Sequence, residues 1–197
     1  MGALTDLGKK ELIFTIGRYI GYFFQIIKGF LLAKILGPEL FGFFGIFLLV
    51  QQYLVYSNFG IQYALNIKLS VNDNNKSTLS KSIKSIIFSS SLLLIVSLFL
   101  IFSKIDLNFV VPTSHFIIGL LVITILFHIQ EVFLNVFRIK KEFYVILFTE
   151  ICISISAIVV IPFFDGIELL YAVIISWILA LILSVTIFKI NYKHTIK

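Results

Sequence analysis

The sequence predicts an all-α integral membrane protein with six transmembrane helices, and three observations support this. Of the 197 residues, 59% are hydrophobic and only 13% are charged, whereas soluble domains contain about 25% charged residues. Six continuous apolar runs reach the roughly 20 residues that a helix needs to cross hydrocarbon. Basic residues gather in short segments between alternate runs, as orientation signals do. We therefore expect residues 1–197 to form a single membrane domain.

The apolar runs are continuous rather than alternating, which favours transmembrane helices over transmembrane strands. The first run is not a cleavable signal peptide, because Arg18 interrupts it and no Ala-x-Ala site follows it. Cys152 is the single cysteine and lies inside an apolar run, so the sequence holds no disulfide framework. The six runs cover about residues 12–34, 40–66, 83–103, 116–137, 143–164 and 169–190. The second helix could end earlier, because Ser57, Asn58 and Gly60 interrupt its run.

A polar turn at residues 33–42 separates the first two runs. Gly37 is expected to end the first helix, because glycine adopts left-handed backbone angles at little cost. Pro38 suits the first position of the next helix, where its missing N–H costs nothing. Glu39 then opposes the positive end of that helix dipole. The stretch predicts a membrane hairpin with a short connection.

The remaining connections are also polar. Residues 70–82 are rich in Asn, Asp, Ser and Lys without apolar periodicity, which predicts a solvated linker. The connections around 106–114 and 165–168 are short and carry acidic residues. Pro112 and Pro162 flank these two connections and predict helix ends or kinks.

The distribution of Lys and Arg predicts the orientation. Of the 16 Lys and Arg residues, twelve fall at the chain ends and in the connections on one side of the membrane. Only Lys34 and Lys104 fall in the connections on the other side, and Arg18 and Lys28 lie inside the first run. The positive-inside rule places the more basic side, with both termini, in the cytoplasm. This pattern also explains the net charge of +6 without a nucleic-acid partner. The twelve cations of the more basic side are Lys9, Lys10, Lys68, Lys76, Lys81, Lys84, Arg138, Lys140, Lys141, Lys189, Lys193 and Lys197.

Ionisable residues inside the apolar runs are the candidate site residues, because each is costly to keep in a membrane. In the first run, Gln25 falls about 20° and Lys28 about 80° from Arg18 around a helix, so the three share a face. In the fourth run, five polar residues follow one helical stripe, and the fifth run adds Glu150. The stripe consists of Thr124, His128, Glu131, Asn135 and Arg138.

Counting along the helices places three of these charges at one depth. Arg18, Glu131 and Glu150 each lie about seven residues from the inner ends of their helices, or roughly 10 Å. They are expected to form one polar layer with one cation and two acids. Structural explanations stay open: Lys28 could snorkel to the surface, Arg18 could form a purely structural ion pair, and His128 could be a packing residue.

Three stretches carry a resemblance to a known family. Residues 33–42 read Ala-Lys-x-Leu-Gly-Pro-Glu-x-Phe-Gly, residues 58–65 follow with Asn-Phe-Gly-Ile-Gln-Tyr-Ala-Leu, and residues 138–143 form a basic segment. This pattern resembles the polysaccharide-export (O-antigen flippase) proteins of the multidrug/oligosaccharidyl-lipid/polysaccharide exporter superfamily. Asn58 stands where the family more often has an acid. The resemblance covers most of this chain but only the first half of a typical member.

The resemblance implies one lobe of a two-lobe exporter in the bacterial cytoplasmic membrane, moving an undecaprenyl-diphosphate-linked glycan. A second six-helix lobe, from a homodimer or a separate chain, is the implied partner. Arg18 and Lys28, with Gln25 beside them, are the candidates for binding the anionic headgroup. Glu131, Glu150 and His128 are the candidates for coupling to a proton or a sodium ion.

Other functions remain possible on the sequence alone. A small-molecule antiporter of the same superfamily would more often have an acidic cavity, whereas the first run offers cations. A membrane enzyme would need a catalytic set, and the outer connections offer only Asp106, His115, Asp165 and Glu168. No catalytic, metal-ligand or phosphate-cradling motif occurs, so we expect neither an enzyme nor a cofactor. A non-transporting fragment or accessory subunit is the third alternative.

Overall fold

The computed structural model describes residues 2–56, 60–71, 75–102 and 112–195. These residues are almost entirely helical and contain no strand, which confirms the all-α prediction. Asn58, Lys104 and most of the connection around 106–114 lie outside the described residues. The elements are α1 (Gly2–Val55), α2 (Ile61–Val71), α3 (Asn75–Phe102), α4 (Thr113–Ile139), α5 (Phe143–Val160), the short 3₁₀ helix η2 (Ile161–Phe163) and α6 (Gly166–Thr195).

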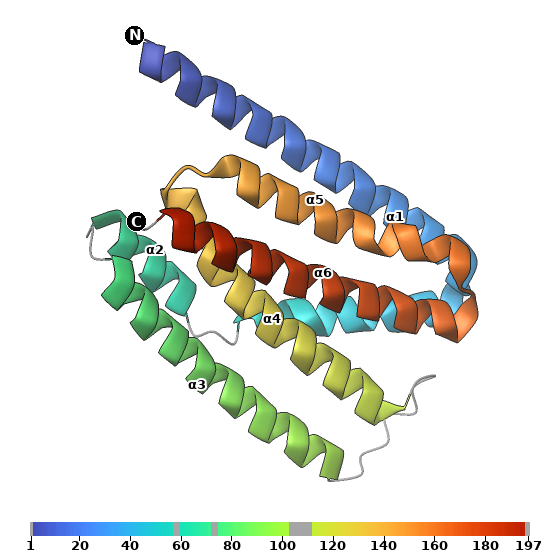
Figure 1. Cartoon of the computed structure of the whole chain (residues 1–197). Coiled ribbons are helices and arrows are strands. Elements are labelled where there is room, and N and C mark those ends of the chain that lie inside the picture. Colours follow the sequence, from blue (N-terminus) through green and yellow to red (C-terminus); the bar gives the residue numbers. More distant parts are fainter. Residues whose placement is uncertain (1, 57–59, 72–74, 103–111, 196–197) are drawn as a thin grey trace.

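Helix α1 is folded back on itself at Gly37, whose φ of 71° and ψ of 175° are not helical. Figure 1 shows the two arms, residues 2–36 and 38–55, leaving this point as a hairpin. Five described helical stretches are long and apolar enough to cross a membrane, and the first, Glu11–Val55, has 45 residues. At 1.5 Å per residue that stretch is about 68 Å long, enough for two crossings of a 30 Å hydrocarbon core. The predicted hairpin is confirmed.

Two sequence-based boundaries are wrong. The second arm ends at Val55 rather than near residue 66, and a separate helix, α2, begins at Ile61. Gly60 has a φ of 73°, which interrupts helical geometry just before α2. The predicted solvated linker at 70–82 is largely helical, since α2 extends to Val71 and α3 begins at Asn75. Serine and lysine cost a helix less than 1 kcal/mol each, so the apolar part of α3 can extend through them.

Helix α4 lies at the centre and packs against α1, α2, α3, α5 and α6. The main core forms where α4 meets both arms of α1 together with α6. Phe47 of the second arm is fully buried, and its ring contacts that of Phe116 on α4 edge to face at 5.6 Å. Leu32 of the first arm and Leu181 of α6 are also fully buried in this cluster.

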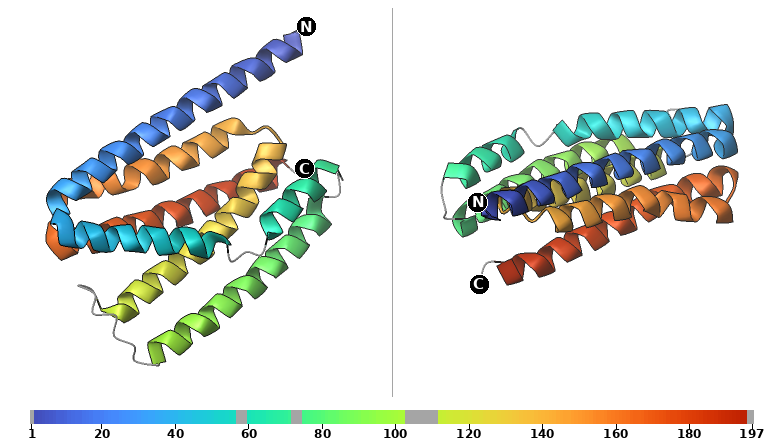
Figure 2. Two further views of the ribbon diagram at one scale, coloured as in Figure 1. Left: turned by 180° about the vertical axis from the view of Figure 1, so that it is seen from behind. Right: turned by 90° about the horizontal axis from the view of Figure 1, so that it is seen from above.

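The α2–α3 pair forms a separate flank of the molecule (Figure 2). Its contacts run mainly to α4. The small cluster that attaches it contains Leu65 of α2, Ile86 of α3, and Val132 and Val136 of α4. The bundle therefore has α4 as its centre, α1 with α5 and α6 on one side, and α2 with α3 on the other.

The turn between α4 and α5 is closed by backbone hydrogen bonds. The Glu142 N–H donates to the Phe137 carbonyl at 3.0 Å, and the Lys141 N–H donates to the Arg138 carbonyl at 3.1 Å. Lys141 has a φ of 58°, so this lysine occupies the left-handed position that glycine usually takes after a helix. The break predicted after the fourth run is confirmed here, as is the helix end at Pro162, which lies in η2.

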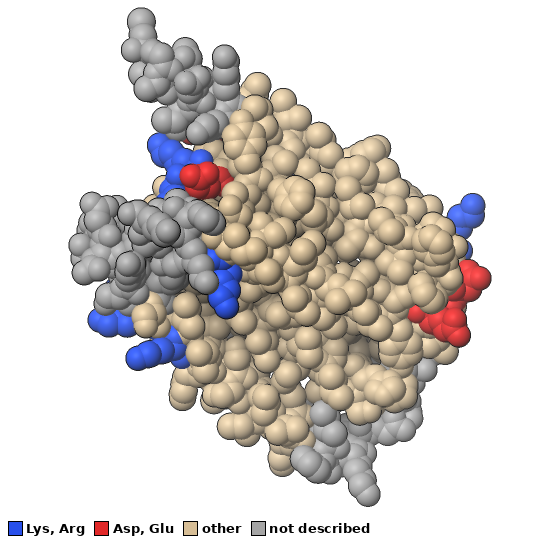
Figure 3. All heavy atoms as spheres, in the orientation of Figure 1, with Lys and Arg blue, Asp and Glu red and all other residues tan. Residues whose placement is uncertain are grey.

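Charge is distributed unevenly along the bundle. In Figure 3 most Lys and Arg side chains of the visible face gather at one end, with one acidic group among them, and a further acidic group lies at the opposite end. The chain reverses direction at this opposite end twice, at the Gly37 kink and at the η2 connection between α5 and α6 (Figure 1). The arrangement is the one that membrane orientation by basic loops produces.

Candidate functional site

The first arm of α1 approaches α5 closely at two glycines. A Cβ atom added to Gly17 would overlap the side chain of Leu147, and one added to Gly21 would lie 3.9 Å from the Ser154 hydroxyl oxygen. Residues four apart lie on one side of a helix, and the missing side chain at Gly17 leaves room for the Leu147 side chain of α5. Sequence analysis missed this Gly-x-x-x-Gly pair, although the signal is present in the apolar run at 17–21.

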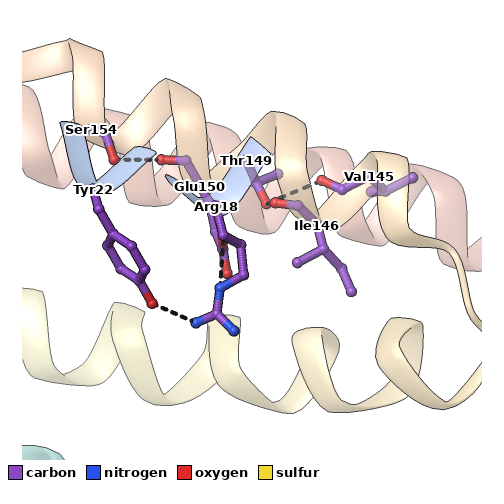
Figure 4. A network of polar contacts seen from close by, with 7 residues as sticks. All are labelled: Arg18, Tyr22, Val145, Ile146, Thr149, Glu150 and Ser154. Carbon is purple, nitrogen blue, oxygen red and sulfur yellow. Dashed lines mark hydrogen bonds and ion pairs between the residues drawn. The ribbon is translucent and has the colours of Figure 1, made fainter. Parts of the chain in front are cut away.

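Arg18 follows Gly17 directly and therefore reaches α5. Its Nε atom lies 3.8 Å from Glu150 Oε2. Its Nη2 atom donates a hydrogen bond to the Tyr22 hydroxyl at 3.1 Å, one turn further along α1. The guanidinium carbon also lies 5.7 Å from the Phe14 ring centroid and 5.8 Å from that of Tyr22, within cation–π range. Figure 4 shows the Arg18, Tyr22 and Glu150 side chains extending from the α1 and α5 backbones toward one another.

The Arg18–Glu150 pair is not sealed inside the protein. The Arg18 side chain is 44% exposed and that of Glu150 is 31% exposed. Both charges belong to helices that are otherwise apolar, where an ionised side chain without a counter-ion would be costly.

Glu131 and Arg138 of α4 complete the charged layer. Glu131 lies within electrostatic range of Arg138, Glu150 and Arg18, and Glu150 lies within range of Arg18 and Arg138. Arg138 also donates a hydrogen bond from Nη1 to Asn135 Oδ1 at 3.3 Å. Arg138 thus adds a second cation to the expected group of one cation and two acids, because it interacts electrostatically with both carboxylates. The expected contact of Arg18 with one of the two carboxylates is confirmed for Glu150.

Lys28 and Gln25 are not brought together with Arg18. The Lys28 ammonium lies 6.0 Å from the centroid of the Trp177 ring on α6. Ten residues separate it from Arg18 along the arm, which corresponds to about 15 Å. The Gln25 side chain is exposed. The shared helical face predicted these residues to act together, but lateral packing assigns Lys28 to α6 and Arg18 to α5.

His128 makes its described contact with the second arm of α1. The side chain is completely buried, and its Nε2 atom hydrogen-bonds to the Val55 carbonyl at 3.1 Å. Because a carbonyl only accepts, Nε2 carries the proton in this contact. The last carbonyls of a helix lack intrahelical partners, so His128 satisfies one where the arm ends. Among the described residues, His128 Nδ1 and the neighbouring Thr124 hydroxyl have no hydrogen-bond partner.

Within the part of the chain that the structure describes, no group of three His, Cys, Asp or Glu residues is placed to hold a metal ion. Comparison with protein-family models, curated proteins and solved structures finds no match to this chain.

Proposed function

We propose that this chain is one six-helix lobe of a transporter that moves an anionic lipid-linked glycan across the bacterial cytoplasmic membrane. The observation that carries the proposal is the partly exposed Arg18, held 3.8 Å from Glu150 inside apolar spans. The resemblance at residues 33–42 and 58–65 adds the substrate class, an undecaprenyl-diphosphate-linked oligosaccharide.

Arg18 is suited to the diphosphate of such a lipid. A guanidinium presents a planar fork of donors that matches phosphate oxygens, and an unpaired phosphate is costly in hydrocarbon. In the resting state Glu150 is the counter-ion of Arg18. The arriving diphosphate replaces Glu150, which is then left to accept a proton or a sodium ion. Glu131, in range of both charges, is the second candidate for this coupling.

A second lobe is part of the proposal. Transporters built from repeats place the substrate between two such units, and the first arm of α1 carries Arg18 at the edge of this one (Figure 2). The partner is a second copy of the chain or a separately encoded lobe. Protein that is monomeric in liposomes and still flips the lipid would contradict this part of the proposal.

The substrate prediction is tested in liposomes that contain the protein purified from its native membrane and a fluorescent polyprenyl-diphosphate oligosaccharide. Arg18→Gln should slow flipping about 10- to 100-fold, the equivalent of one lost charged hydrogen bond at 1.5–3 kcal/mol. Arg18→Lys should retain part of the rate, because the charge remains but the fork is lost. Lys34→Gln is the matched control, an exposed cation near the Gly37 kink, and should stay within about twofold of the wild type.

Comparing Arg18→Gln with Glu150→Gln separates the proposal from the alternative of a small-molecule antiporter. In an antiporter, the carboxylates of Glu131 and Glu150 would bind the transported cation. An antiporter for organic cations would lose transport in Glu150→Gln and keep it in Arg18→Gln. Normal flipping in Arg18→Gln at normal abundance would remove Arg18 from the substrate site.

The orientation is tested with single cysteines in a Cys152→Ser background. Glu39 and Lys141 are both exposed, near the Gly37 kink and in the α4–α5 turn. Because the basic end is expected in the cytoplasm, an impermeant thiol reagent added to intact cells should label Glu39→Cys and not Lys141→Cys. The reverse labelling pattern would invert the proposed orientation.

A further inference from the structure

Helix α2 is too short to cross a membrane. Its 11 residues, Ile61–Val71, span about 16 Å, roughly half of a hydrocarbon core. It packs against α3 and α4 and lies at the end of the bundle where α3 begins (Figure 1). The apolar span of α3 begins at Ser80, and α2 packs along its first part, with Leu65 in the same cluster as Ile86. We therefore expect the C-terminal end of α2 at the boundary between headgroups and hydrocarbon.

The inward face of α2 is fixed by the hydrophobic cluster described above. Leu65 is 1% exposed and contacts Ile86 of α3 and Val132 of α4, with Ile61 packed against the same cluster. This anchoring determines which residues of α2 face away from the protein.

The exposed residues of α2 include an apolar pair and a cation on different sides of the helix. Tyr63 is 73% exposed and Ile67, four residues later on the same face, is 48% exposed. Lys68 is also exposed, about 100° around the helix from Ile67. Tyrosine is enriched at membrane–water interfaces, and a lysine at that depth extends its ammonium toward the headgroups. Figures 1 and 2 show α2 running alongside α3, so its C-terminal end lies at the end of the bundle where α3 begins.

The first turns of α3 add two more cations. Lys81 and Lys84, three residues apart, are both exposed, while Ser82 and Ile86 between and after them are buried. Neither α2 nor α3 contains an acidic residue in its described range. Within the described residues of α2 and α3, the exposed charges are therefore all positive.

We infer that Tyr63, Ile67, Lys68, Lys81 and Lys84, here called the α2–α3 basic face, bind the headgroups of anionic phospholipids. Tyr63 and Ile67 enter the boundary of the acyl region, and the three ammonium groups pair with lipid phosphates. Such contacts contribute for each lysine about a fivefold increase in affinity for an anionic surface. The interaction is independent of any transported glycan, since Arg18 and Glu150 belong to the opposite flank of α4.

The test compares lipid binding to purified, delipidated protein by native mass spectrometry, with phosphatidylglycerol or phosphatidylcholine as the probe. Wild-type protein should prefer phosphatidylglycerol. Lys68→Gln/Lys84→Gln should reduce its affinity for phosphatidylglycerol about 30-fold, at about fivefold per lysine. The control Lys141→Gln/Lys189→Gln removes two exposed cations from the α4–α5 turn and α6 and should change the affinity less than about threefold. Lys68→Arg/Lys84→Arg should keep the preference, because the charge is retained.

Equal losses in the test and control variants would show a general charge effect and overturn the assignment. A wild-type protein without a preference for phosphatidylglycerol would also overturn it and would point to an acidic protein partner. A second measurement does not depend on the folding of the lysine variants. A fluorophore attached to Tyr63→Cys, in the Cys152→Ser background, should be quenched by headgroup-labelled lipid in phosphatidylglycerol nanodiscs. Quenching no greater than that of a fluorophore in bulk water would contradict the placement of α2 in the interface.

Discussion

Helix α4 and the first arm of α1 both carry polar residues within apolar runs. Most of these polar residues are buried in α4, whereas most are exposed in the first arm of α1. In α4, which contacts every other long helix, Thr124, His128 and Asn135 are almost completely buried. In the first arm of α1, at the edge of the bundle (Figure 2), Arg18 and Gln25 are exposed. The comparison shows that these polar residues are buried in the central helix, where His128 bonds to the end of the second arm of α1, and exposed in the edge helix.

The largest expected effect is on α4, where replacing His128 should disturb the whole bundle. His128→Ala removes a fully buried ring and its hydrogen bond to the Val55 carbonyl. We expect a loss of about 2–4 kcal/mol in the free energy of unfolding, from the cavity and the unpaired carbonyl together. Reversible unfolding in mixed detergent micelles measures it.

Thr124→Val on the same face of α4 is the control for this prediction. Its hydroxyl has no partner among the described residues, so an isosteric methyl should be neutral or slightly stabilising. If His128→Ala and Thr124→Val had equal effects, the structural role assigned to the central helix would fail.

An intermediate effect is expected where the edge helix touches the bundle. Gly17→Ala would push its new methyl group into the Leu147 side chain, and such overpacking costs about 1–3 kcal/mol. Gly29→Ala on the same arm meets nothing within 4 Å and should be neutral or stabilising by up to about 1 kcal/mol, because alanine favours a helix over glycine. Thermal unfolding of the two variants in detergent gives the comparison. Destabilisation by both would mean that the arm is sensitive everywhere, not at its contact with α5 alone.

The smallest effect is expected for the charge pair itself. A double-mutant cycle of Arg18→Gln and Glu150→Gln should give a coupling of about 0.5–1 kcal/mol, since partly exposed pairs contribute little to stability. The cycle with Glu131→Gln should give less, because Glu131 interacts with Arg18 at longer range. Membrane abundance and unfolding are the readouts. Additivity in both cycles would show that the edge helix holds no charge network.

Features set by local geometry could be predicted from the sequence. The Gly37 hairpin follows from glycine and proline at adjacent positions, and the common depth of Arg18 and Glu150 follows from the constant rise of a helix. The break before α2 is indicated by the interruption at Ser57, Asn58 and Gly60, although the run as a whole is assigned to about residue 66. A run that stays hydrophobic does not reveal which glycine adopts a positive φ.

Lateral placement could not be predicted. A helical face fixes which residues of one helix point the same way, but the neighbouring helix that this face meets depends on packing. Lys28 therefore lies over Trp177 and His128 meets the end of the α1 second arm. The Gly17–Gly21 pair was the one lateral signal in the sequence, because the absence of side chains marks where another backbone can approach.

Gly37 determines more than the shape of α1. The apolar stretch through this residue is long enough for two crossings of a membrane. The kink therefore determines on which side of the membrane every later segment begins. A chain that kept α1 straight would cross once where the folded chain crosses twice. Each later connection, including the α4–α5 turn with Lys141 and the basic start of α3, would then emerge on the other side of the membrane. One backbone conformation at a single glycine thus decides which compartment each end of the remaining helices faces.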